Sequence, residues 1–188
     1  MYPIQMQVGN RGMGMGYDQF VKTFNSVCLE HKKCGRARAF AFLFYDMTHG
    51  VVREALKNAY GFQRLHDKTA KDVTLFYLHA NAVSSHWQNF NRGFMEALGI
   101  EDQAQTPCMV FFNVTGENIE DVSIYAIDEK STDPVLTVAE LEQYVDEAIN
   151  KLNAEGNFSA LTSIGKSLAS FGSLIRLTEF LLKLKGTA

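Results

Sequence analysis

The sequence predicts an α/β fold, a three-layer α/β/α sandwich in which helices cover both faces of a mixed central sheet. Short, continuous apolar runs alternate along the chain with longer segments whose apolar residues recur at helical spacing. Such alternation is typical of parallel strands joined by crossover helices. Later in the chain, two strand-like runs are separated by only six residues (115–120), in which TGEN supplies a turn. A link this short predicts an antiparallel hairpin and therefore a mixed sheet.

The first helix and the first central strand follow from local patterns. DQFVKTFNSVCLEH (18–31) carries its apolar residues on one helical face. Cys34-Gly35 fits the end of this helix, because glycine is common just past a helix C-terminus. AFAFLFY (39–45) is continuously apolar and too short for a typical helix. It indicates a strand covered on both faces, and a helix is predicted to follow from about Val51.

The second half of the pattern continues in the same way. DVTLFYLHA (72–80) is predicted as another buried strand, and VSSHWQNFNRGFMEALGI (83–100) as the next helix, ending at Gly99. TPCMVFFNV (106–114) and DVSIYAID (121–128) then form the predicted hairpin. Proline cannot donate a hydrogen bond to a strand ladder, so its place at the start of 106–114 suits a strand's first position.

The last helix of the predicted domain starts at about Val138. Thr137 is expected to be its N-cap, and Glu140 three residues later would complete a T-x-x-E capping box. The domain is therefore predicted over 18–152. Before it, residues 1–17 include four glycines within VGNRGMGMGY and are expected to be flexible, although 2–8 could form a first strand.

Composition excludes several classes of protein. With 188 residues, of which 46% are hydrophobic, the chain can bury a substantial core, and its net charge of −3 argues against a nucleic-acid surface. No secretory signal and no apolar stretch of about 18 residues is evident. The three cysteines are scattered, which is typical of reduced thiols and predicts a cytoplasmic location. The histidines lack metal-ligand spacing, and neither a metal nor a cofactor is expected.

The order of elements resembles the thioredoxin-like fold over residues 18–152. The dipeptide Thr106-Pro107 carries the resemblance, because in that family a T-P pair opens the strand after the third helix, with a cis peptide bond. An X–Pro bond is the kind for which cis is energetically accessible. The resemblance implies that Pro107 presents the backbone of Thr106 at one end of the sheet. It also places the segment YDMTHGVV (45–52) beside it.

This chain departs from the family at the position of the redox cysteines. YDMTHGVV (45–52) occupies the start of the helix that should carry them, and it contains no cysteine. Dithiol exchange needs a thiolate there, so a scaffold without redox activity, and not an enzyme, is predicted. A binding site at this end of the sheet would comprise six residues, namely Asp46, Thr48, His49, Thr106, Pro107 and Cys108.

The remaining 153–188 are predicted as a linker and a C-terminal amphipathic helix. Within 159–185 the apolar residues recur at three- and four-residue steps. Those expected to contact a partner are Leu161, Ile164, Leu168, Phe171, Ile175, Leu177, Leu181 and Leu184. The helix could pack against its own domain, form a homodimer or bind another protein; an interfacial membrane helix is a further alternative.

The sequence therefore predicts a protein-interaction module on a thioredoxin-like scaffold. Compatible roles are a chaperone, an accessory subunit of a bacterial complex or an immunity protein that covers a toxin. Two alternatives remain open. One is a thiol-dependent enzyme that uses Cys108 near Pro107, or the segment from Asp46 to His49. The other is a peripheral membrane-surface protein tethered by the C-terminal helix.

Overall fold

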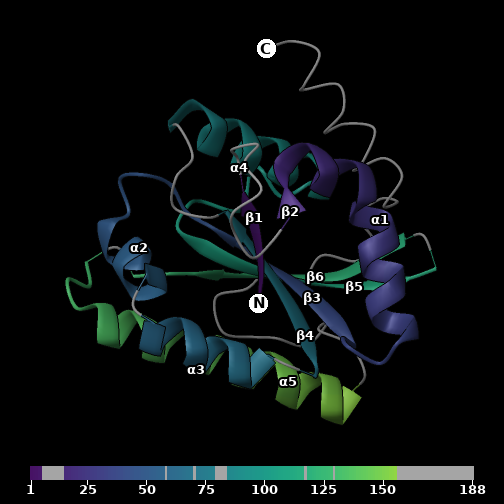
Figure 1. Ribbon diagram of the computed structural model, residues 1–188. Coiled ribbons are helices and arrows are strands. Elements are labelled where there is room, and N and C mark those ends of the chain that lie inside the picture. Colours follow the sequence, from purple (N-terminus) through teal and green to yellow (C-terminus); the bar gives the residue numbers. More distant parts are fainter. Residues whose placement is uncertain are drawn as a thin grey trace.

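The computed structural model describes residues 1–5, 15–57, 59–69, 71–78, 84–116, 118–128 and 130–155. Strands and helices alternate along these residues as the sequence predicts (Figure 1). In chain order the elements are β1 (Tyr2–Gln5), β2 (Met15–Gly16), α1 (Tyr17–Lys33), β3 (Ala39–Phe44), α2 (Gly50–Lys57), α3 (Ala59–Thr69), β4 (Val73–Leu78), α4 (Ser84–Leu98), β5 (Cys108–Thr115), β6 (Asn118–Ala126) and α5 (Pro134–Glu155).

Within the described residues the strands form one mixed sheet of six, in the order β2-β1-β4-β3-β5-β6. The first four of these run parallel to one another, whereas β5 is antiparallel to both β3 and β6. The predicted hairpin is confirmed by the pairing of β5 with β6, in which Thr115 lies opposite Asn118. The antiparallel pairing of β3 and β5 brings the end of one strand beside the start of the other.

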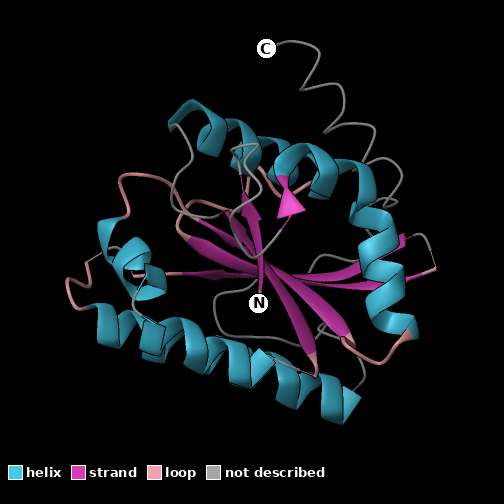
Figure 2. Ribbon diagram, viewed as in Figure 1, coloured by secondary structure: helices cyan, strands magenta, loops and turns pink. Residues whose placement is uncertain are grey.

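Helices cover both faces of the sheet (Figure 1 and Figure 2). α1 and α4 lie on one face, and α2, α3 and α5 lie on the other. The three central strands β3, β4 and β5 are buried on both sides, apart from the exposed end of β5 at Thr115. The α/β class predicted from the sequence is thus confirmed.

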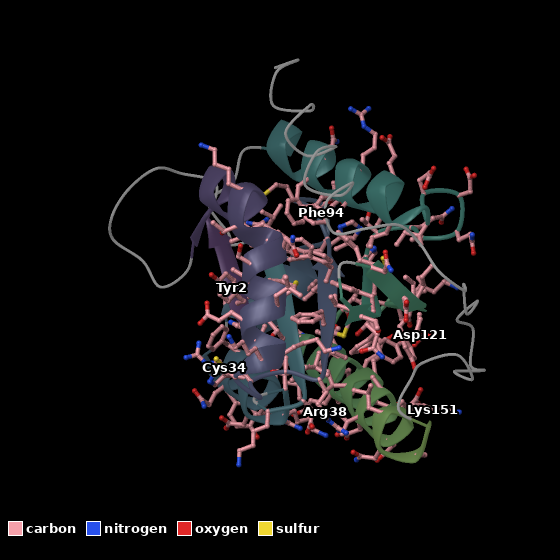
Figure 3. The ribbon with its side chains drawn as sticks, turned by 90° about the vertical axis from the view of Figure 1, so that its right-hand side faces the viewer. Tyr2, Cys34, Arg38, Phe94, Asp121 and Lys151 are labelled. Carbon is pink, nitrogen blue, oxygen red and sulfur yellow. The ribbon has the colours of Figure 1, made fainter. Side chains whose placement is uncertain are left out.

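Phenylalanine rings fill the core between the sheet and the α1/α4 layer. Phe40, Phe42 and Phe44 alternate along β3, so their side chains leave the strand on the same face. The ring of Phe42 is centred 4.5 Å from Phe94 of α4 and 5.6 Å from Phe24 of α1. In Figure 3, Phe94 lies between α4 and the sheet. Because each fully buried ring contributes about 1.5–3 kcal/mol, this cluster is a major source of stability.

The opposite layer depends on a close approach between helices. A Cβ atom added at Gly61 of α3 would lie 2.4 Å from the carbonyl oxygen of Ala55 and 2.8 Å from Cγ2 of Val138. Gly61 is therefore required where α3 meets α2 and α5. Nearby, the guanidinium of Arg64 forms a bidentate ion pair with the carboxylate of Glu142, joining α3 to α5.

The N-terminal part of the chain contributes to the sheet. Residues 1–17, expected as a flexible segment, contain β1, which pairs with β4, and the two-residue strand β2. The alternative of a first strand within 2–8 agrees with β1 at Tyr2–Gln5. β1 is held there because its Ile4 is fully buried opposite Leu78.

The start of α5 differs from the prediction. The helix begins at Pro134, where the missing N–H of proline is harmless, and Oδ1 of Asp133 accepts a hydrogen bond of 2.8 Å from the N–H of Val135. Thr137 lies inside the helix and its Oγ1 donates to the carbonyl of Asp133. The predicted capping box at Thr137 and Glu140 is therefore wrong, because the Asp133-Pro134 pair starts the helix one turn earlier.

The single helix predicted after β3 is instead two helices, α2 and α3. The ends predicted for α1 and α4 are confirmed. Gly35 and Gly99 follow these two helices with φ angles of +63° and +66°. This left-handed conformation is the one glycine adopts without strain.

The two outer strands of the sheet are irregular. Among the described residues, β2 contributes two. On the other side, the register between β5 and β6 shifts between Phe111 and Asn113, and Asp121 of β6 has a φ of +53°. A shift of this kind is a β-bulge, which bends a strand and interrupts its ladder.

The predicted partner contacts from Leu161 to Leu184 lie outside the described residues. Among the residues that are described, no helix is both long and apolar enough to cross a bilayer.

Candidate functional site

The end of β3 and the start of β5 bring the predicted site residues together. Phe44 pairs with Cys108 in the antiparallel register, so the chain leaving β3 lies beside the chain entering β5. The peptide bond between Thr106 and Pro107 is cis. A cavity of about 290 Å³ at this point is lined by Thr48, His49 and Pro107. The expected proximity of these three residues is therefore present in the structure.

Asp46 organises the loop between β3 and α2. Its Oδ1 accepts hydrogen bonds from the N–H of Thr48 at 2.8 Å and from the Oγ1 hydroxyl of Thr48 at 2.5 Å. Nδ1 of His49 lies 2.9 Å from the same oxygen. The first hydrogen bond of α2 then runs from the N–H of Arg53 to the carbonyl of His49. A short side chain that bonds its own backbone two residues on is well suited to such a turn.

The protonation state of His49 determines which group its Nδ1 contacts. Nδ1 lies 3.0 Å from the backbone N–H of Asp46, and this N–H donates to it when Nδ1 carries no proton. If Nδ1 is protonated, it can instead donate to Oδ1 of Asp46 at 2.9 Å. An imidazole in contact with a carboxylate can act as a general acid or base. Nδ1 of His49 therefore lies within hydrogen-bonding distance of both the backbone N–H and the carboxylate of Asp46.

The carboxyl of Asp46 is ionised at neutral pH. Burial raises the pKa of Asp46. The hydrogen bonds from Thr48 and the charge of His49 lower it by more than burial raises it, so that the pKa lies below its ordinary 3.8. The loop thus carries a fixed negative charge at this end of the sheet.

A second cavity, of about 460 Å³, lies beside Asp46 and Thr106 and extends along α4. Asn91 of α4 is part of its wall, and Nδ2 of Asn91 donates to the carbonyl of Tyr45 at 3.0 Å. The hydroxyl of Tyr45 in turn donates to the carbonyl of Leu78 at the end of β4. These two bonds connect α4, β3 and β4 directly behind the candidate site.

Cys108 belongs to the core rather than to either cavity wall. Its side chain is fully buried on β5, and burial raises the pKa of its thiol from an ordinary 9.0 to about 12. A nucleophilic cysteine needs the opposite shift, towards the thiolate. The structure therefore gives no support to a reactive Cys108.

The other two cysteines are also free thiols. Cys28 is buried, and burial raises the pKa of its thiol, with a smaller opposing effect from the charge of Lys32. Cys34 is exposed at the end of α1 (Figure 3). No disulfide joins Cys28 to Cys34.

Several residues around the cavities were not anticipated from the sequence. Asp128 and Ser131, which follow β6, line the smaller cavity, because the N–H of Ile127 donates to the carbonyl of Pro107 at 3.0 Å. Their position follows from the pairing of β6 with β5. The predicted hairpin therefore held the signal that could have placed them beside Pro107. Asn91 also gave a signal, since an amide stands on the otherwise apolar face of the predicted helix beside Phe90.

In the described part of the chain, no three His, Cys, Asp or Glu side chains are grouped as metal ligands would be. Comparisons with protein-family models, with curated proteins and with solved structures found no match for this chain.

Proposed function

We propose that this chain is a non-redox protein-interaction module on a thioredoxin-like scaffold. Three features support the scaffold. The sheet is mixed, β5 pairs with β3 as the resemblance requires, and the peptide bond before Pro107 is cis beside the start of α2. The antiparallel β5–β6 hairpin and the final helix α5 complete the order of elements that the resemblance implies.

One observation carries the non-redox part of the proposal. The loop that enters α2 next to Pro107 holds Thr48, His49 and Gly50, where dithiol exchange would need a cysteine. Cys108 directly follows Pro107 in the sequence. Its side chain is buried, and burial raises the pKa of its thiol to about 12. Thiolate chemistry is therefore disfavoured at this end of the sheet, and binding through its polar cavities is favoured instead.

The partner, in this proposal, is another protein or a second copy of the chain, bound through 159–185. The apolar side chains in that segment recur on one helical face, which is the pattern of a helix that docks in a protein groove. The net charge of −3 disfavours nucleic acid as the partner. A membrane surface is a weaker alternative because the segment has no tryptophan.

Redox activity provides the first test. The purified full-length protein is assayed for reduction of insulin disulfides with a thiol reductant and for peroxidase turnover. We expect no rate above the reductant alone, both for the wild type and for Cys108→Ser. Turnover by the wild type that disappears in Cys108→Ser would overturn the non-redox assignment.

Binding through the C-terminal segment is tested with a matched pair of charge substitutions. Leu168→Asp and Phe171→Asp place a carboxylate among the predicted contacts, whereas Ala169→Asp places the same charge on the side of the predicted helix that carries Arg176 and Lys183. Each variant is compared with the wild type by sedimentation equilibrium and by affinity purification from the native host. We expect the first two variants to lose self-association or partner recovery and the third to retain it. Equal behaviour of all three would contradict the proposed surface.

A further inference from the structure

Asp46 and His49 form hydrogen bonds to each other in both directions across the loop that enters α2. The carboxylate of Asp46 accepts from the N–H of Thr48 at 2.8 Å. Three residues after Asp46, Nδ1 of His49 reaches back to the N–H of Asp46 at 3.0 Å. This reciprocal arrangement has the form of a capping box, in which glutamate or glutamine ordinarily holds the second position. Histidine replaces that acceptor with one that is lost when the ring nitrogen binds a proton.

The N–H of Asp46 depends on this acceptor. In the part of the chain that the structure describes, Nδ1 of His49 is the acceptor found for it. The carboxylate of Asp46, in contrast, already accepts from the N–H and hydroxyl of Thr48 and from the N–H of His49. Asp46 is partly buried, and a buried N–H without an acceptor costs about as much as a lost hydrogen bond. Neutral His49 is therefore expected to carry its proton on Nε2, so that Nδ1 accepts from Asp46.

A proton on Nδ1 reverses this preference. The same nitrogen lies 2.9 Å from Oδ1 of Asp46. Once protonated, it can no longer accept, and it would face the N–H of Asp46 donor to donor at 3.0 Å. A charge-assisted hydrogen bond to a carboxylate is roughly twice as strong as a neutral one. The protonated ring therefore pairs with the carboxylate, and the N–H of Asp46 loses its acceptor.

This loop is connected both to α2 and to the smaller cavity. The N–H of Arg53 donates to the carbonyl of His49 at 3.1 Å, and Nη1 of Arg53 donates to the carbonyl of Met47 at 3.2 Å. Thr48 and His49 line the cavity of about 290 Å³ together with Pro107. A rearrangement of the loop therefore changes both the first turn of α2 and the wall of this cavity.

Carboxylates outnumber cations around His49. The charged groups on or directly behind the surrounding walls are Asp46 of its own loop, Arg53 of α2, Asp128 after β6 and Glu140 of α5, which accepts from the N–H of Asp128. β5 and α5 line the cavity itself with the uncharged Pro107 and Thr137. A proton taken up by His49 therefore offsets part of the negative charge on this wall.

We propose that His49 is a pH-sensitive switch in the loop from Asp46 to Gly50. When the ring is neutral, Nδ1 holds the N–H of Asp46 and fixes the loop. When the ring is protonated, Nδ1 donates to the carboxylate of Asp46, the N–H is released, and a positive charge appears beside Pro107. Histidine is the side chain whose charge ordinarily changes between about pH 5 and 8. The switch goes beyond the proposed interaction role and does not depend on the segment 159–185.

The test follows the ring and the loop together in the ¹⁵N-labelled full-length protein between about pH 5 and 8. Long-range ¹H–¹⁵N spectra of the imidazole report which ring nitrogen carries a proton, and the backbone amide spectrum reports the N–H of Asp46. We expect His49 to carry its proton on Nε2 at the upper end of this range and protons on both nitrogens at the lower end. The amide proton of Asp46 should move upfield, as on loss of a hydrogen bond, with the same midpoint as the ring.

Two substitutions assign the response to His49. His49→Gln is the matched variant, because the side-chain oxygen of glutamine accepts from the N–H of Asp46 at every pH. It is expected to keep the loop in its neutral-state arrangement and to abolish the pH response of the amide at position 46. His66→Gln is the control, since His66 is exposed on α3, and it should leave the response unchanged.

The proposal is overturned if Nδ1 of His49 already carries a proton at the upper end of the range. It is also overturned if the ring does not titrate, or if the amide of Asp46 stays in place while the ring does. An unchanged response in His49→Gln would assign the effect to another group and would have the same consequence. The first three outcomes are read from the wild type, so they stay decisive even if His49→Gln is unstable.

Discussion

Alkylation of Cys108 provides the sharpest test of how the candidate site is built. Iodoacetamide reacts with the thiolate, and burial raises the pKa of the Cys108 thiol from 9.0 to about 12. At neutral pH this shift lowers the thiolate fraction by about a thousandfold relative to an ordinary cysteine. Burial of the side chain slows the reagent further. We therefore expect Cys108 to be labelled at least about a thousandfold more slowly than the exposed Cys34.

The assay is a time course of labelling of the native full-length protein, with each cysteine quantified separately by peptide mass spectrometry. Cys28 is an internal control, because it is also buried and should be labelled slowly. In concentrated urea all three should react at similar rates. Labelling of native Cys108 as fast as that of Cys34 would refute the burial argument and would favour the thiol-dependent enzyme.

Three further predictions concern stability. Gly61→Ala should lower the free energy of unfolding by about 1–3 kcal/mol in urea titrations, because the added Cβ would lie 2.4 Å from the backbone oxygen of Ala55. Gly50→Ala is the control and should be nearly neutral, because a Cβ there would have nothing within 4 Å. Equal effects of the two substitutions would contradict the close packing at Gly61. Phe42→Ala should cost about 3–5 kcal/mol in the same titrations, and a loss below 1 kcal/mol, roughly that of a surface site, would be inconsistent with its burial. The pKa of Asp46 is lower in the folded state, so its charge stabilises the protein above the ordinary pKa of 3.8 and this contribution is lost as pH falls through the folded value. Asp46→Asn should therefore be less stable than the wild type at pH 7, with a difference that narrows in acid; a difference independent of pH would argue against ionic stabilisation.

The central strands could be predicted because their signal is local. A run such as 39–45 is apolar at every position, and only a strand covered on both faces buries all of it. The place of Pro107 at the start of β5 was predictable from an equally local signal, because proline cannot donate a hydrogen bond within a strand ladder. The hairpin followed from the length of its link.

Two kinds of feature were not predicted: those decided by competition between neighbouring capping residues, and those that depend on tertiary packing. Thr137 and Asp133 both have good capping side chains, and the outcome was decided by Pro134, whose fixed φ suits the first helical position. Asn91 and Glu101 meet in one cavity only because α4 and the chain before β5 pack beside the Asp46 loop. No spacing in the sequence encodes that proximity.

The irregular margins of the sheet restrict how this molecule can associate. β-Augmentation and fibril growth both need a long row of aligned N–H and C=O groups on an open strand. Among the described residues β2 supplies two residues, and the irregularity near Asp121 interrupts the regular ladder of β6. Within the part of the chain that the structure describes, the margins of the sheet are therefore less suited to strand addition than a long, regular edge strand would be.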